Sequence, residues 1–265
     1  EVCGWTIYNW VRGAWGNQNM IGCMQHSLNV CLSWIATQLG PMQFYDYLER
    51  FGIGHRTNID LAGEEVYPLS VPGDPMWYTV NLATNSFGQG VAVTPVQFLM
   101  AASAIANEGQ MVAPHVLKSY IQDGQQYDTT PQIVGKPITA QTAKTLTDML
   151  TISLEEEASD ALVEGYRVAG KTGTAEIAVN GQYSSNKTNA SFIGWGPIDD
   201  PQFIVFVWLE KPSTSIWGSI VAAPVFREIV QETFNYLNVP PVMPVEPEPA
   251  KEQLNVSIGT GELGA

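Results

Sequence analysis

The 265-residue chain is poor in basic residues and has no long apolar run. Its 12 Lys and Arg stand against 26 Asp and Glu, a formal net charge of −14. That balance argues against nucleic acid or an anionic membrane as partner, because both attract cations. No apolar run approaches the roughly 18 residues of a membrane span, and no signal peptide is visible. Since the first residue is Glu rather than Met, we expect a piece of a longer protein whose anchor or export signal lies upstream.

Metal-binding patterns are equally scarce. The three cysteines, Cys3, Cys23 and Cys31, lack metal-ligand spacing, and the histidines are scattered without an H-E-x-x-H motif. An odd cysteine count fits either buried thiols or one disulfide with a remaining thiol. We therefore expect no metal site and no cofactor, and the redox compartment stays open.

Local patterns predict both helices and strands. With 45% hydrophobic residues, the chain can bury one sizeable core. Helical spacing, capping residues and Gly or Pro stops predict helices at 29–39, 42–51, about 95–107, about 139–152 and about 222–237. Extended runs at 171–179, about 189–196 and 202–210, joined by tight turns, predict an antiparallel meander.

This order of elements predicts an α+β fold of three layers, with an antiparallel sheet flanked by helices. We expect one domain over residues 1–238. From about residue 239 the sequence becomes rich in Pro, Glu and Gly, which predicts a disordered tail over 239–265.

Residues 165–172 satisfy G-x-x-x-x-G-K-[ST], the phosphate loop of nucleotidases. Such a loop requires a buried strand before it and a helix after it. The acidic stretch at Glu155–Glu157, which we expect to be a solvated loop, makes a poor buried strand. A short extended run follows, ended by the hairpin dipeptide Asn180-Gly181. We therefore discount a nucleotidase, a reading that magnesium-dependent ATP binding would revive.

Lys171, Thr172 and Gly173 also form K-T-G, a strand motif of penicillin-recognising serine acyltransferases. Far upstream, Ser27-Leu28-Asn29 precedes the helix predicted at 29–39. Taken alone, Ser27 would be read as a helix N-cap. An S-x-N turn well ahead of a K-T-G strand, however, is the pair that accompanies the catalytic serine in these enzymes.

Over roughly residues 1–238 the chain resembles the transpeptidase domain of a class B penicillin-binding protein, which implies a β-lactamase/transpeptidase-like fold. Beyond the two motifs, the resemblance rests on blocks in the family's order, at Phe51–Gly54, Thr57–Glu64, Phe87–Gly90, Ala106–Gly109, Val168–Ala175, Ser191–Gly194 and Ala222–Phe226. Each block is weak alone, but their order and spacing make coincidence implausible.

The resemblance implies a substrate, a peptidoglycan stem peptide ending in D-Ala-D-Ala, and roles for six residues. Ser27 would pass a proton to the leaving amine, Asn29 would hold the acyl donor, and Lys171 would attract the terminal carboxylate. Thr172 and Thr174 would hydrogen-bond that carboxylate, and the Thr174 N–H would form half of an oxyanion hole. Gly173 would let the substrate approach the strand edge closely, with a β-bulge as the alternative explanation.

The family's S-x-x-K motif, which carries the nucleophilic serine, is missing at the expected place. Ser184–Lys187 matches the letters but follows K-T-G in a polar connection between predicted strands, where nothing would lower the pKa of a solvated lysine. We therefore expect a fold incomplete at its N-terminus, with the nucleophile outside this chain and the chain alone inactive.

The resemblance also implies partners and a location. It implies β-lactams as inhibitors and a membrane glycosyltransferase of the cell-elongation or cell-division machinery as a partner. It places the protein at the extracytoplasmic face of a bacterial membrane. Two alternatives stay open: a penicillin-recognising carboxypeptidase, β-lactamase or sensor that shares the motifs, and a non-catalytic scaffold of the wall-building machinery.

Overall fold

The structure is a computed structural model that describes residues 1–179 and 182–242. Its helices are α1 (Met20–Gln25), α2 (Asn29–Leu39), α3 (Pro41–Arg50), α4 (Thr79–Ser86), α5 (Pro95–Ala106), α6 (Ala140–Glu157), the 3₁₀ turn η1 (Ser159–Ala161), α7 (Gly218–Val221) and α8 (Ala223–Leu237). Its strands are β1 (Met111–Val112), β2 (Ser119–Gln122), β3 (Gln125–Asp128), β4 (Ile133–Gly135), β5 (Ala169–Val179), β6 (Gln182–Gly196) and β7 (Phe203–Glu210).

The central sheet is the predicted antiparallel meander, in the order β5-β6-β7. Strand β6 begins at Gln182, earlier than the predicted start near 189, so the hairpin with β5 is longer than expected. The last pair before the turn is Val179 opposite Gln182, and the turn residues 180–181 lie outside the described residues.

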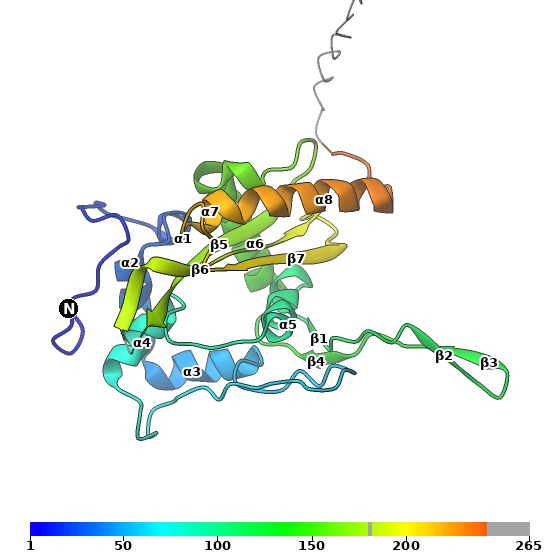
Figure 1. Ribbon diagram of the computed structural model, residues 1–265, viewed down its shortest axis with the longest axis horizontal. Helices are drawn as coiled ribbons and strands as arrows, with labels where there is room; N and C mark the ends of the chain where they lie inside the picture. Colours follow the sequence, from blue (N-terminus) through cyan, green and yellow to red (C-terminus); the bar gives the residue numbers. More distant parts are fainter. Residues whose placement is uncertain (180–181, 243–265) are drawn as a thin grey trace, which may run out of the picture.

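Helices cover both faces of this sheet, which gives three layers (Figure 1). Phe203, Val205 and Val207 of β7 pack against the core that contains the buried side chains of α8. Their neighbour Ile204 packs with Leu150 of α6 in a second cluster, on the opposite face. Because strand side chains alternate between faces, a strand covered on both sides needs a continuous apolar run, and β7 has one. The predicted α+β fold with a flanked antiparallel sheet is confirmed.

The predicted helix starts are visible as caps. Thr94 Oγ1 accepts a hydrogen bond from the Gln97 N–H at 3.1 Å, and Thr139 Oγ1 accepts one from the Thr142 N–H at 3.1 Å. The prediction of a loop at Glu155–Glu157 is wrong, because α6 continues to Glu157. Leu154, only 1% exposed, packs into the main core and carries the last turn of α6 with it.

Two features lie away from the sheet. The β2–β3 hairpin extends from the body of the molecule (Figure 1), and Tyr120 and Tyr127 stack across it with ring centroids 5.3 Å apart. At the other end of the chain, the Tyr166 hydroxyl donates to the Val239 carbonyl at 2.7 Å, and the Val242 N–H donates to the Gly165 carbonyl at 2.9 Å. The start of the predicted tail thus contacts the domain, and residues 243–265 lie outside the described residues.

Over residues 1–179 and 182–242, none of the helices combines the length and apolar character that a membrane span requires.

Candidate active site

Ser27 lies in the turn between α1 and α2, and the hydrogen bonds there define its position. The Ser27 N–H donates to the Met24 carbonyl at 3.3 Å, and the Leu28 N–H donates to the Cys23 carbonyl at 3.0 Å. These two bonds form a Schellman motif that ends α1, with Ser27 at the position after the C-cap. That position requires a left-handed backbone, and Ser27 has φ 48°. The N-cap alternative is wrong, because Leu28 is the N-cap of α2.

Asn29 is the first residue of α2, and the N-terminal segment lies across it. Its Nδ2 donates to the Tyr8 carbonyl at 3.1 Å, and the next N–H, of Val30, donates to Asn9 Oδ1 at 3.0 Å. Trp10 adds a third contact, because its Nε1 donates to the His26 carbonyl at 3.3 Å. Residues 8–10 therefore hold the Ser27–Asn29 turn from one side.

Lys171, Thr172, Gly173 and Thr174 lie in the first half of β5, one of the two outer strands of the sheet among the described residues. Lys171 Nζ donates to Thr172 Oγ1 at 3.2 Å, with the lysine half-buried. Farther along the strand, Gln89 Nε2 donates to the Glu176 carbonyl at 3.1 Å. Alternate residues of a strand direct their backbone groups to the same edge. The backbone N–H and C=O groups of residues 172 and 174 therefore point to the same edge of β5 as the Glu176 carbonyl, which Gln89 contacts.

Gly173 pairs with Ser191 of β6 in a regular register, and the β-irregularity of β5 occurs later, between Glu176 and Ile177. The bulge alternative for Gly173 is therefore wrong. A Cβ at Gly173 would collide with Ser191 Oγ, so packing within the sheet also favours glycine there. Close by, the Gly218 N–H of α7 donates to Thr174 Oγ1 at 3.2 Å, which ties the motif strand to a helix.

Two packing contacts bring the Ser27 turn to the start of β5. Met24 of α1 packs against the cluster that contains Ala169 of β5 and Trp195 of β6. The Trp10 ring, already bonded to the turn, lies 5.0 Å from the ring of Trp217, the residue before α7. The Ser27 turn and the K-T-G strand are thus linked through neighbouring residues, by Met24 with Ala169 and by Trp10 with Trp217.

Sequence reasoning missed two parts of this region, Trp10 and Trp217. For the cysteines it left two alternatives open, and the structure has the second, one disulfide between Cys23 and Cys31 with Cys3 as the remaining thiol. Nothing in the sequence marks Trp10 and Trp217 as neighbours, because they are more than two hundred residues apart.

The two competing motifs do not have the geometry they would need. No helix begins at residues 171–174, where β5 continues to Val179, so the phosphate-loop alternative lacks its anion-binding helix end. Ser184–Lys187 lies within β6 rather than on a helix, and Ser184 Oγ bonds Asn186 Oδ1 at 2.6 Å. Only a helix brings residues three apart onto one face, so this serine and lysine do not form a nucleophile pair.

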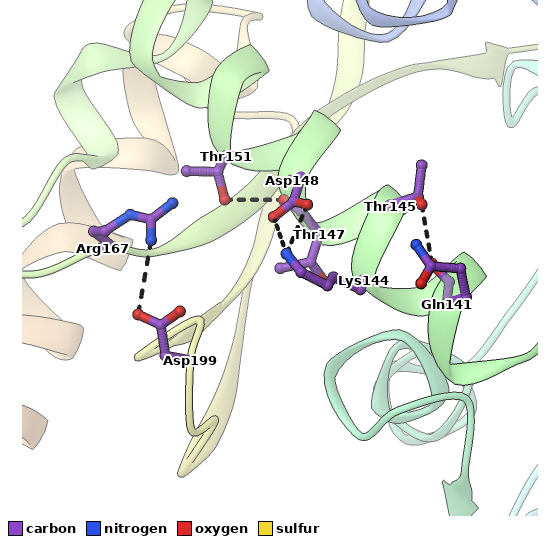
Figure 2. A network of polar contacts seen from close by, with 8 residues as sticks. All are labelled: Gln141, Lys144, Thr145, Thr147, Asp148, Thr151, Arg167 and Asp199. Carbon is purple, nitrogen blue, oxygen red and sulfur yellow. Dashed lines mark hydrogen bonds and ion pairs between the residues drawn. The ribbon is translucent and has the colours of Figure 1, made fainter.

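A groove between α5, α6 and residues 198–201 contains none of the six site residues. Two exposed ion pairs lie at or near it (Figure 2): Lys144 pairs with Asp148 at 2.8 Å, and Arg167 pairs with Asp199 at 3.7 Å. Exposed ion pairs of this kind contribute about 0–1 kcal/mol each. The groove therefore combines exposed ion pairs with none of the predicted site residues.

Residues 3–231 match the family described as the penicillin binding protein transpeptidase domain. Stage V sporulation protein D of Bacillus subtilis is 36% identical over 249 residues, which cover 91% of this chain and 38% of that protein. A Neisseria flavescens protein named "Probable peptidoglycan D,D-transpeptidase PenA" is 31% identical over 84% of this chain and 54% of its own length.

Solved structures agree. Penicillin binding protein 3 of Mycobacterium tuberculosis, complexed with ampicillin, superposes with a TM-score of 0.77 at 30% identity, over 91% of this chain and 56% of that one. The fold and the match along the sequence define a domain of the penicillin-recognising type. The chain belongs to the penicillin-binding protein transpeptidase domain family, and it spans less than two thirds of the length of these relatives.

Proposed function

We propose that the complete protein carrying this chain is a serine-type peptidoglycan D,D-transpeptidase of cell wall synthesis. The observation that carries the proposal is the K-T-G strand at an outer sheet edge, with the helix before the S-x-N turn packed against the start of that strand through Met24 and Ala169. Membership of the transpeptidase family supports it, as does the similarity to PenA, which is named a probable peptidoglycan D,D-transpeptidase.

We assign the β5 edge to the carboxyl end of a stem peptide. An extended peptide adds to a strand edge through main-chain hydrogen bonds, and β5 offers such an edge. The Lys171 ammonium supplies positive potential for the terminal carboxylate, and the hydroxyls of Thr172 and Thr174 bind it. The Thr174 N–H donates to the oxyanion that forms on the attacked carbonyl. Because Gly173 has no side chain, the substrate can approach this strand edge closely.

We place Ser27 and Asn29 on the side of the bound stem peptide opposite the β5 edge. We assign the Ser27 hydroxyl to passing a proton to the leaving amine. The amide nitrogen of Asn29 is bonded to the Tyr8 carbonyl. Its Oδ1 is therefore the atom we assign to the acyl donor and to the lysine of S-x-x-K.

The nucleophile is a serine that this chain does not contribute. Its Oγ attacks the penultimate D-Ala carbonyl, the C–N bond to the terminal D-Ala breaks, and the released amine takes up a proton. An amine of a neighbouring strand then attacks the resulting ester and restores the serine. On this proposal the chain by itself is inactive.

The proposal extends to partners and location. β-Lactams act as inhibitors, and the complete protein works at the extracytoplasmic face of the membrane with a glycosyltransferase of the elongation or division machinery. The Cys23–Cys31 disulfide suits such a location, because disulfides persist in oxidising compartments. A carboxypeptidase, β-lactamase or sensor would share these motifs, and an acceptor-amine assay separates them. A scaffold would take up no penicillin.

Labelled penicillin tests the proposal. The complete protein should form a covalent adduct that survives denaturation, and Lys171→Ala should lower its rate of formation by about a hundred-fold or more. Lys187→Ala, an exposed lysine on β6, is the matched control and should label normally. The 265-residue chain expressed alone should not label. Near-normal labelling of Lys171→Ala, or a covalent adduct on the isolated chain, would contradict the assignment.

A further inference from the structure

A disulfide closes around the S-x-N turn. It joins Cys23 in α1 to Cys31 in the first turn of α2, with Cα atoms 5.9 Å apart, a usual separation for a disulfide. The ring it closes contains Ser27 and Asn29, both of which we assign to acyl transfer. The third cysteine, Cys3, is exposed and lies outside this ring.

Cys23 holds the Ser27 turn in two ways. Its carbonyl accepts the Leu28 N–H at 3.0 Å, the longer-range bond of the Schellman motif, and its sulfur is bonded to Cys31. Cys23 and Leu28 are each only 2% exposed, so the anchor on both sides of Ser27 is buried. The turn is therefore fixed by one residue that contributes both a backbone and a covalent link.

The turn needs such an anchor. Ser27 has a left-handed backbone, which disfavours a residue with a Cβ by roughly 1–2 kcal/mol. Helix α1 has only six residues, too few to be stable without tertiary contacts. A strained residue at the end of a short helix keeps its conformation only where its surroundings enforce it.

We propose that the Cys23–Cys31 disulfide is a positioning element that holds the Ser27 hydroxyl in place for acyl transfer. Reduction by a small dithiol passes two electrons and two protons to the sulfur pair, which yields two thiols and the cyclic disulfide of the reagent. The end of α1 is then free to move, Ser27 relaxes toward a right-handed backbone, and its hydroxyl leaves its position. This inference rests on the proposed function, because its consequence is read in acylation.

The route of reduction is consistent with the burial of the two cysteines. Cys31 is partly exposed whereas Cys23 is buried, so the incoming thiolate attacks the sulfur of Cys31.

The test uses the complete protein with labelled penicillin, untreated and after dithiothreitol. The acylation rate constant is measured separately from the affinity of the non-covalent complex, at a temperature where circular dichroism shows both forms folded. Reduction should lower the rate constant about ten-fold or more with little change in affinity, and reoxidation should restore it. Cys3→Ser should respond to dithiothreitol as the wild type does.

The Cys23→Ala, Cys31→Ala double variant should be as slow as the reduced protein and insensitive to dithiothreitol. Sensitivity in that variant would place the effect at another cysteine and overturn the inference. In a Ser27→Gly background, removal of the disulfide should lower the remaining rate no further, because the disulfide acts through Ser27. An equal decrease in both backgrounds would indicate general loosening and would also overturn it.

The outcomes separate the two proposals. A wild-type protein that is acylated equally fast when reduced and when oxidised contradicts the role of the disulfide and leaves the transpeptidase assignment standing. Alkylation of Cys23 and Cys31 without prior reduction contradicts it as well. No labelling in either state contradicts the proposed function, and with it the part of the disulfide in acyl transfer.

Discussion

Ser27 occupies a position that favours glycine. The residue after the C-cap of a Schellman motif is left-handed, and glycine adopts that conformation without a Cβ penalty. The structure has Ser27 there, with φ 48°. A side chain at this point is therefore a local destabilisation, of the kind that occurs where a group is needed for chemistry.

Replacement of Ser27 separates strain from function. Ser27→Gly should be about 1 kcal/mol more stable than Ser27→Ala, since glycine relieves the left-handed strain and the gain exceeds its extra entropy when unfolded. Both variants lack the hydroxyl and should lose acylation to the same extent. Urea unfolding gives the free energies and penicillin labelling gives the rates. An alanine variant as stable as the glycine variant would show that the turn is not strained.

At this scale the sequence identifies the residue types but not their local geometry. From the sequence alone Ser27 is interpreted as a cap of the helix that follows, whereas the structure places it at the end of α1. The difference depends on α1, whose six residues are too few to show helical periodicity. The position of Lys171 on a strand, by contrast, follows from the extended run that leads to the predicted turn at 180–181. Its identity as a sheet edge depends on pairing that only the structure shows.

Among the elements, α7 sits directly on the motif strand. It has four residues, and its first, Gly218, has buried surroundings and donates to Thr174 Oγ1. A Cβ at Gly218 would collide with the carbonyl oxygens of Ser191 and Gly173, which are backbone atoms that cannot rotate aside. A Cβ at Gly173 would meet only the Ser191 hydroxyl oxygen, which can.

The two glycines should therefore differ sharply. Gly218→Ala should destabilise the fold by about 1–3 kcal/mol, as overpacking does, and should also slow acylation because α7 moves away from Thr174. Gly173→Ala should have a smaller effect on stability, about 0.5–1.5 kcal/mol for a displaced side-chain rotamer, and adding Ser191→Ala should recover it. Thermal and urea unfolding of the three variants give the comparison. Equal losses at both glycines would mean that the strand and α7 are not packed as described.

Elements with end signals were predictable, and elements without them were not. Thr94 and Thr139 announce α5 and α6, because their side chains cap the helices that follow. The end of α6 was predicted too early because its acidic residues suggested solvent, whereas buried Leu154 extends the helix. The β2–β3 hairpin carries the dipeptide Asp123-Gly124, a strong turn signal, so the sequence did contain the information for it.

The helix at 29–39 shows that the apolar pattern predicts a helix without predicting which of its faces is buried. Its bounds were predicted correctly, but the apolar residues that indicated it include Trp34, which is 63% exposed. The buried positions are Ser33 and Ala36, since α2 packs closely against α4. Small residues allow that close approach, and hydrophobicity alone does not reveal which face it uses.

At the scale of the whole molecule, the net charge of −14 destabilises the compact state through repulsion between like charges. Some individual carboxylates nevertheless stabilise the fold. Hydrogen bonds from the backbone N–H groups of Val116 and, to a smaller extent, Leu117 lower the pKa of Asp60. The same bonds connect the loop at 57–64 to the base of the β2–β3 hairpin, the hairpin arm. A hydrogen bond from the Thr57 hydroxyl lowers the pKa of Glu64, and hydrogen bonds from backbone N–H groups lower it further.

The acid limb of the stability profile should depend on these two carboxylates. Because their folded pKa values lie below the unfolded ones, they stabilise the protein above about pH 4 and lose that contribution as the pH falls through the folded values. We expect the free energy of unfolding to rise from pH 7 to about pH 5, as the negative charge decreases, and to fall below about pH 4. Salt should flatten the rise, since it screens charge repulsion, and leave most of the fall. Urea unfolding from pH 3 to 7 measures both limbs.

Asp60→Asn should make the fall below pH 4 shallower, because its side chain no longer titrates. Asp123→Asn removes an exposed carboxylate at the tip of the β2–β3 hairpin, away from this loop, and should leave the fall unchanged. A wild-type acid limb in the Asp60 variant would show that the hydrogen bonds of Asp60 to the hairpin arm do not contribute to acid unfolding. The sensitivity of the whole molecule to acid would then arise from Glu64 and from the overall charge rather than from the carboxylate that ties this loop to the arm.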